Sequence, residues 1–345
     1  MTQNQNANTS TARKEIPEIL RGKRYLDPTY DPAFYALLDD EEALADFINS
    51  LLHLEDGRKI KSMKYTFNQP LILRAPEAKE IKFDIHAWTE DNRCMDIEIQ
   101  RTSHPFFTDR VLLYGAYLTI DGKIKMDKSP EFKALEENER KRRRYQLPEI
   151  VSIWLCNFPL RLEPKSFRDT WHLYSDNAVK QGNPVPVFDK MSYILIDLGE
   201  FSKIHAKAES REEQWLYLLT HAGKANASMD FADPILQKAL ERIEIGSASD
   251  ELLSSQVDSM VTQDEIDARI ADGVVTGRQQ GIQQGIQQGI QQGIQQGIQQ
   301  GIQQGLDSTL TALDLLSKGT PVATIAKETK LSEDHIRQLQ SKMTK

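Results

Sequence analysis

Hydrophobic residues between positions 31 and 54 recur every three or four residues, a spacing that predicts helical structure. A second helix is predicted to begin within this stretch, with Asp40 as its N-cap and Glu41 and Glu42 in its acidic first turn. Similar reasoning predicts helices over residues 105–120, 211–223 and 232–245.

Alternation of apolar and polar residues predicts two strands, over residues 81–88 and 95–100, and the polar turn between them indicates a β-hairpin. In this hairpin one face is predicted to carry Ile81, Phe83, Ile85, Ala87, Met95, Ile97 and Ile99, and the other Lys82, Asp84, His86, Trp88, Asp96, Glu98 and Gln100. A nearly continuous apolar run at 148–158 predicts a buried strand. Further strands fit residues 60–66, 71–74, 171–176 and 192–199. The mixture predicts an α/β fold.

The chain changes character from Gly273, after which glycine recurs every fourth residue as far as Gly305. Such a stretch is expected to be an extended helical or partly disordered spacer that is compatible with self-association, because each helical glycine costs about 1 kcal/mol relative to alanine. The last residues resemble a small helix-turn-helix, with Ser332 as the N-cap of its second helix. The predicted organisation is a disordered tail (1–21), a core (22–200), a helical connector (201–272), the glycine-periodic spacer (273–305) and a small helical tail (306–345).

The composition is that of a globular protein, with 39% hydrophobic and 27% charged residues and a formal net charge of −8. We find no run of about 20 apolar residues, the length that a membrane-spanning helix requires. Cys94 and Cys156 each lie in a strand-like apolar run, which predicts buried free thiols and a cytoplasmic location rather than a zinc framework.

The hairpin concentrates acidic residues on one predicted face, where Asp84 would lie near Asp96 and Glu98. Carboxylates on facing positions of neighbouring strands lie close enough to repel each other. A hard divalent cation such as Mg²⁺ or Mn²⁺ relieves that repulsion. The alternative is an amphipathic hairpin whose polar face simply meets water.

The order and spacing of these residues resemble a known family of nucleases. Phe83-Asp84, a spacer of thirteen residues, the segment 96–100 with Glu98-Ile99-Gln100, the segment 110–114 and the glycine-periodic tail are similar to the Rpn recombination-promoting nucleases of the PD-(D/E)XK superfamily, over residues 22–305. The resemblance implies a restriction-endonuclease-like core: a mixed sheet flanked by helices, followed by a helical C-terminal region. It also implies a metal-dependent DNA endonuclease of low sequence preference that promotes recombination or mobile-element movement.

The resemblance also implies roles for individual residues. Asp84 and Glu98 would bind Mg²⁺, or Mn²⁺ or Ca²⁺, together with the Ile99 carbonyl, and Gln100 would stand where a lysine usually orients water. Gln100 forms hydrogen bonds but carries no charge. A further acid from the entry helix, Glu41 or Glu42, is expected to face the site. The family often has Phe-Lys in that helix, whereas this chain has Phe34-Tyr35.

Two basic elements are candidate DNA contacts. Arg110 and Tyr114 share a helix face, which predicts either a phosphate contact or aromatic packing on the sheet with Arg110 at the rim. Arg142 and Arg143 belong to a basic run that either follows a DNA backbone or pairs with the acidic residues one turn earlier. His86 and His104 are expected to be surface residues.

Two other functions fit the same residues. A degenerate fold could bind DNA as a transposition accessory without cutting it, as the missing lysine would favour. The repeat could instead drive self-assembly of an interaction protein. A homodimer is compatible with the nuclease, since two cores would be needed to cut both strands together.

Overall fold

The computed structural model describes residues 15–71, 81–162, 165–204 and 208–343. It divides into two compact units, Met1–Gln263 and Asp264–Lys345. Within the described residues, none of the helices is long and apolar enough to cross a membrane.

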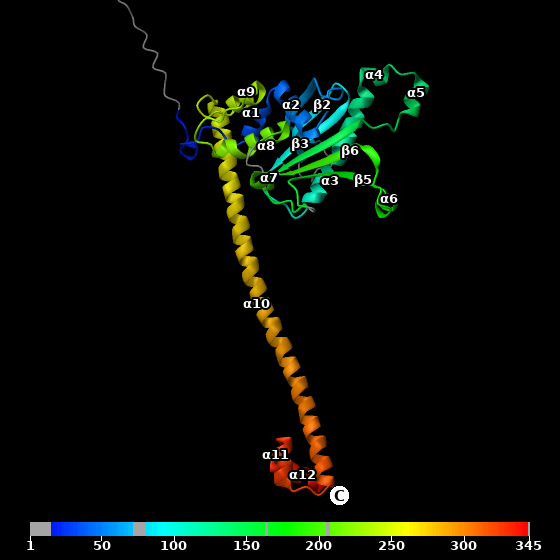
Figure 1. Cartoon of the computed structure of the whole chain (residues 1–345), viewed down its shortest axis with the longest axis vertical. Coiled ribbons are helices and arrows are strands. Elements are labelled where there is room, and N and C mark those ends of the chain that lie inside the picture. Colours follow the sequence, from blue (N-terminus) through cyan, green and yellow to red (C-terminus); the bar gives the residue numbers. More distant parts are fainter. Residues whose placement is uncertain (1–14, 72–80, 163–164, 205–207, 344–345) are drawn as a thin grey trace, which may run out of the picture. The chain divides into compact units, whose positions relative to one another are not determined.

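The first unit is built on a mixed sheet of six strands in the order β1-β2-β3-β4-β6-β5 (Figure 1). Strands β2 and β3 form the predicted antiparallel hairpin, β3, β4 and β6 run parallel, and β1 and β5 add antiparallel edges. The strands are β1 (Met63–Leu71), β2 (Ile81–Thr89), β3 (Arg93–Gln100), β4 (Glu149–Cys156), β5 (Arg168–Tyr174) and β6 (Pro186–Asp197). This is the α/β fold that the sequence predicts. Instead of short strands at 60–66 and 71–74, the structure has the single strand β1, and residues 72–74 lie outside the described residues.

One face of the sheet is covered by several helices that share the larger hydrophobic core. They are η1 (Glu18–Leu20), α1 (Asp31–Leu38), α2 (Glu41–Leu52), α7 (Leu198–Ile204), α8 (Arg211–His221), η2 (Ala222–Lys224), α9 (Pro234–Arg242) and the start of α10. The Asp40 side chain accepts a hydrogen bond from the Ala43 N–H, which confirms the predicted N-cap of α2. Leu51 and Trp215 are buried there with Ile85 and Ile97 of the hairpin.

The opposite face is covered by α3 (Phe107–Lys128), which places Val111, Tyr114 and Leu118 over Trp154 of β4. This helix runs eight residues past the predicted end at residue 120. Short helices α4 (Pro130–Lys133) and α5 (Glu137–Arg142) lie between α3 and β4, and α6 (Asp176–Lys180) connects β5 to β6. The central strands β3 and β4 are therefore covered on both faces.

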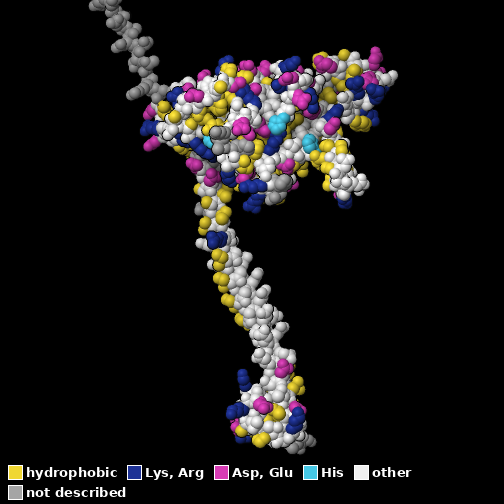
Figure 2. All heavy atoms as spheres, in the orientation of Figure 1, with side chains coloured by type: hydrophobic (Ala, Val, Ile, Leu, Met, Phe, Trp, Pro, Cys, Tyr) yellow, Lys and Arg dark blue, Asp and Glu magenta, His cyan; other side chains and the backbone are white. Residues whose placement is uncertain are grey.

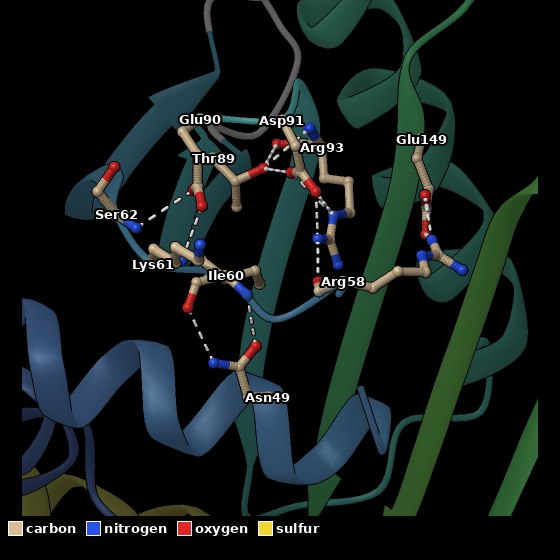
Figure 3. Close-up of polar contacts among 10 residues, drawn as sticks. All are labelled: Asn49, Arg58, Ile60, Lys61, Ser62, Thr89, Glu90, Asp91, Arg93 and Glu149. Carbon is tan, nitrogen blue, oxygen red and sulfur yellow. Dashed lines mark hydrogen bonds and ion pairs between the residues drawn. The ribbon is translucent and has the colours of Figure 1, made fainter. Parts of the chain in front are cut away.

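The turn of the hairpin is fixed to the loop before β1 by side-chain hydrogen bonds (Figure 3). The buried Arg93 pairs with Asp91 and donates to the Arg58 carbonyl at 2.6 Å. Glu90 accepts from the Lys61 and Ser62 N–H groups at 2.7 and 3.2 Å. This network holds the turn that joins β2 and β3, the two strands that carry the acidic residues.

The compact unit extends beyond the predicted core at both ends. Leu20, in the predicted tail, is only 1% exposed. At the other end, Trp215, Leu236 and Leu253 belong to the same core as the sheet, so the segment predicted as a connector packs with the nuclease-like core as far as Gln263.

The glycine-periodic segment lies in one continuous helix, α10 (Asp250–Ser317). Every residue from 273 to 305 is exposed, and hydrophobic side chains are visible along one edge of part of the helix (Figure 2). In the second unit, α11 (Val322–Thr329) and α12 (Glu333–Met343) bury Ile325 and Ile336 against Ala312. Ser332 accepts from the His335 N–H at 3.3 Å, so the predicted helical pair and its N-cap are confirmed.

Candidate active site

Asp84 lies where the regular alternation of β2 breaks. Ile85 and Ala87 face the larger core, as predicted, but Phe83 packs in the smaller core beneath α3 with Cys94 and Tyr114. The prediction that Phe83 shares a face with Ile85 is therefore wrong. In β1, the residue between the partners of Ile85 and Phe83 is Asn68, whose φ is 49°. A residue in this left-handed region interrupts the pleat that the alternation rule assumes.

Two hydrogen bonds link Asp84 to Glu98 and Ile99 where the regular β2–β3 pairing ends. The Asp84 N–H donates to Glu98 Oε1 at 3.0 Å, and the Ile99 N–H donates to Asp84 Oδ2 at 2.8 Å. The regular strand pairing stops one residue away, at Ile85 opposite Ile97. Each carboxylate therefore accepts a hydrogen bond from a backbone N–H of the other strand, which holds the pair near the centre of the sheet.

The acidic groups differ in their exposure. Glu98 and Asp96 are fully buried, whereas Asp84 remains partly exposed. Neither oxygen of Asp96 has a well-formed hydrogen bond among the described residues. A solvent-borne ligand can therefore reach the site at Asp84, with the buried carboxyl groups of Glu98 and Asp96 behind it.

Burial shifts the acidity of all three groups. It raises the pKa of Asp84 to about 7, with a further increase from Asp31 and opposing effects from the Ile99 N–H, Tyr35 and Arg110. It raises the pKa of Asp96 to about 8, against the effect of the Ser152 hydroxyl. The pKa of Glu98 is also raised, by burial and then by Asp84 and Asp96. Such a group of carboxylates favours a bound cation, because a cation offsets their mutual repulsion.

Gln100 and Arg110 complete the site on the side of α3. Arg110 donates from Nη1 to Gln100 Oε1 at 2.8 Å and from Nη2 to the Tyr114 hydroxyl at 3.1 Å. Its Nη2 is 3.6 Å from Glu98 Oε2, and its guanidinium lies over the rings of Tyr114 and Trp154. These are the features of the packing alternative: Tyr114 packs on the sheet, and Arg110 is 37% exposed at its rim. The phosphate contact of Arg110 stays a prediction.

Helix α1 contributes residues that the sequence prediction did not assign. The Tyr35 hydroxyl donates to Asp84 Oδ1 at 3.1 Å, and Asp31 is the nearby charge with the largest effect on Asp84. Glu41, by contrast, accepts from the Met63 N–H at 2.8 Å, so its carboxylate is engaged at the start of β1. The sequence could have indicated Asp31, because it precedes Tyr35 by four residues and therefore lies on the same face of α1.

The other predicted basic residues lie on and next to α5. Arg142 and Arg143 both pair with Glu139, the former at 3.0 Å, and Lys141 pairs with Glu137 at 2.6 Å. These are the pairs with the preceding acidic turn that the alternative interpretation expects. The role of Arg142 and Arg143 in DNA binding remains a prediction.

The two histidines behave differently. His104 is exposed, as predicted, whereas His86 is only 2% exposed, so the prediction of a surface residue at 86 is wrong. The cause is the length of α3, whose Asp121 and Lys125 cover His86. Cys94 and Cys156 are buried and free, as predicted.

Comparison with known proteins identifies a family to which the chain is similar. A family model described as PD-(D/E)XK nuclease family transposase matches residues 28–269. No curated protein and no solved structure matches the chain. The matched range contains the whole sheet, the Asp84–Glu98 pair and the helices that cover both.

Proposed function

The chain belongs to the PD-(D/E)XK nuclease family transposases, and from that premise we propose that it hydrolyses phosphodiester bonds in DNA with the help of a divalent metal ion. Asp84, Glu98 and Gln100 are the proposed catalytic residues. The observation that carries the proposal is the Asp84–Glu98 pair, which two reciprocal hydrogen bonds hold at the centre of the sheet beside Arg110.

The donor set fits a hard cation. Asp84 and Glu98 offer carboxylate oxygens, and the proposed third ligand is the Ile99 carbonyl, so all the ligands are oxygen atoms, as Mg²⁺ prefers. The raised pKa values of Asp84 and Glu98 support this assignment, because carboxylates that are costly to ionise alone become stable anions beside a cation. When bound, such an ion supplies positive charge to the scissile phosphate and increases the acidity of water.

Gln100 and Arg110 together take the place of the usual lysine. The Gln100 side-chain oxygen is already held by Arg110, which fixes its orientation. Its amide nitrogen lies 3.5 Å from Glu98 Oε2 and can donate a hydrogen bond toward the reacting groups. Arg110 then supplies the positive charge that a neutral glutamine lacks, and its exposed edge is suited to a phosphate oxygen.

Helix α1 positions the site from the other side. Tyr35 fixes one oxygen of Asp84 by donating a hydrogen bond. Asp31 is exposed and acidic, so it is the proposed additional acid of the entry helix, in place of Glu41. It would bind the metal through water or hold a second ion.

DNA is the proposed substrate. Sequence preference is expected to be low, because the sequence of the core indicates no element that would read DNA bases. Arg110 and Tyr114 are the proposed contacts nearest the reacting phosphate, with Arg142 and Arg143 binding the backbone further away. The proposed biological roles are recombination or movement of mobile elements.

Nicking of supercoiled plasmid tests the proposal. Purified full-length protein is expected to nick DNA with Mg²⁺ or Mn²⁺ and to stop in EDTA, and Asp84→Ala and Glu98→Ala are expected to lose the metal-dependent activity. Circular dichroism of each variant shows that it is folded. If folded wild type cuts with none of these ions, the protein is a DNA-binding accessory; if both variants still cut, the active site lies elsewhere.

A homodimer is a second proposal, favoured by the exposed repeat. Isoleucines of the repeat such as Ile282 and Ile302 are 53% and 60% exposed, and the nine glycines from 273 to 305 each cost a helix about 1 kcal/mol. A second copy of the helix would bury this surface and offset that cost. Deletion of residues 273–305 should lower the number of chains per particle that light scattering measures. An unchanged number of chains would exclude the repeat as the cause of association.

A further inference from the structure

A second polar cluster lies under the C-terminal half of α3, next to Asp96 and apart from Asp84 and Glu98. His86 Nε2 is 3.0 Å from Asp121 Oδ2 and 3.5 Å from Cys94 Sγ. The ligand atoms of these three residues all lie within 4.8 Å of one another. They come from β2, β3 and α3, so the cluster joins the catalytic hairpin to the helix that carries Arg110.

We infer that His86, Cys94 and Asp121 form a binding site for a zinc-type transition-metal ion, distinct from the proposed magnesium site. In a tetrahedral zinc site, bond lengths of about 2.0–2.3 Å separate a nitrogen and a sulfur ligand by about 3.5 Å, and a nitrogen and an oxygen ligand by about 3.4 Å. The nitrogen–sulfur distance in the structure equals the first value, and the nitrogen–oxygen distance of 3.0 Å needs only a small adjustment.

The donor set determines which ion binds. Imidazole and thiolate ligands favour Zn²⁺ or Co²⁺ over Mg²⁺, which prefers oxygen ligands alone. Three protein ligands also leave the fourth tetrahedral position for water or another ligand. Binding converts the Cys94 thiol to a thiolate and releases one proton. The cluster therefore differs in chemistry from Asp84 and Glu98.

Lys125 fills the role of the cation when no metal is bound. Its Nζ is 2.9 Å from Asp121 Oδ2 and 3.2 Å from both ring nitrogens of His86. A metal ion and the lysine ammonium cannot share this place, because like charges so close repel each other. Metal binding thus requires Lys125 to move, and Lys125 becomes a competitor of the metal.

The surroundings give Lys125 a place to move. The side chain is 34% exposed and, with His86, Trp88 and Lys128, lines a cavity of about 790 Å³. The same cavity connects His86 to solvent. A metal can therefore reach His86 from this cavity while the lysine side chain swings into it.

Cobalt absorption tests the site, because a thiolate ligand gives Co²⁺ a characteristic charge-transfer band. Full-length protein is expected to bind one Co²⁺ per chain with this band, and Zn²⁺ is expected to displace it. Cys94→Ala should abolish the band, His86→Gln should weaken binding at least tenfold, and Lys125→Met should strengthen it at least tenfold. Should Cys94→Ala fail to fold, His86→Gln carries the test.

Matched controls separate this site from other ligands. Cys156→Ala removes the other buried thiol and should retain the band, and so should the double variant Asp84→Asn/Glu98→Gln. Absence of the band in both folded wild type and folded Lys125→Met overturns the inference. So does a band that is lost in Cys156→Ala but kept in Cys94→Ala, or one that is lost when the carboxylate pair is neutralised.

Discussion

Two polar clusters lie on the sheet beneath α3, and each contains one cation from that helix. Arg110 lies beside Glu98 and Gln100, whereas Lys125 lies beside Asp121 and His86. The first cluster offers oxygen ligands and is partly exposed at Asp84; the second adds a thiol and an imidazole and is reached through a cavity. One helix thus borders both proposed sites and places a different basic residue at each.

The two basic residues suit these different tasks. The planar guanidinium of Arg110 forms three contacts at once and packs over two rings, so it stays in place when a substrate binds. The Lys125 ammonium is a point charge on a flexible stem, which can leave when another cation arrives. Substitutions of the two residues should therefore have different consequences.

Replacement of Arg110 is the largest test of this difference. Arg110→Met retains much of the side-chain length but removes the charge beside Glu98 and releases Gln100. We expect the nicking rate to fall by about 100-fold or more, because this is the usual effect of removing one preorganised hydrogen-bond donor from a reacting centre. Arg110→Lys should recover part of the rate, because it restores charge without the paired geometry. Wild-type nicking by folded Arg110→Met would show that Arg110 is only structural.

The stability of the metal-free protein should depend on pH in the direction that buried acids dictate. Asp84 and Asp96 have folded-state pKa values of about 7 and about 8, above their ordinary value of 3.8. The folded chain therefore holds these protons more tightly than the unfolded chain, and stability is lost as the pH rises from about 4 through 7 and 8. If both shifts act in full, we expect the free energy of unfolding to be lower at pH 8 than at pH 5 by about 6 kcal/mol.

Urea unfolding in EDTA at several pH values measures this dependence. Addition of Mg²⁺ should reduce it, because a bound cation stabilises the ionised carboxylates. Asp84→Asn should also reduce it, since the amide does not titrate. A metal-free protein that is most stable at pH 8 would contradict the account of the carboxylate site.

Tyr35→Phe is expected to have the smallest effect. The substitution removes one hydrogen bond to Asp84 and leaves the ring in its packing against Phe67. Losing the full contribution of a hydrogen bond to a charged group, about 1.5–3 kcal/mol, would lower a rate by about 10- to 150-fold. Only part of it should be lost here, because the Ile99 N–H bond keeps Asp84 near its place. Nicking should fall by no more than about tenfold. Tyr65→Phe, a neighbouring tyrosine on β1, is the matched control, and equal losses in both variants would deny Tyr35 a specific role.

The sequence predicts the parts of this molecule that follow a regular period. The alternation of β2 and β3 predicts the hairpin, the acid-rich start of α2 predicts its cap at Asp40, and the thirteen-residue spacer identifies Asp84 and Glu98 as a pair. These features depend on neighbours along the chain or on an adjacent strand. Such contacts leave a direct trace in the order of residues.

The features that were missed depend on distant segments. The face of Phe83 could not be predicted, because the interruption at Asn68 belongs to another strand. His86 was expected at the surface because nothing in its own strand reveals that Asp121 and Lys125 of α3 lie over it. The contribution of Tyr35 was missed because the family often has a lysine there. In each case the decisive partner is far away in the sequence.

The rate of plasmid nicking against Mg²⁺ concentration tests the central claim most directly, for wild type beside Glu98→Gln and Asp176→Asn. Asp176 is an exposed acid on α6 that pairs with Lys180, so its substitution controls for loss of a negative charge. The account predicts saturable, metal-dependent cutting by wild type and Asp176→Asn, and no cutting above the EDTA background by folded Glu98→Gln. Cutting by Glu98→Gln with the wild-type dependence on Mg²⁺ would contradict it.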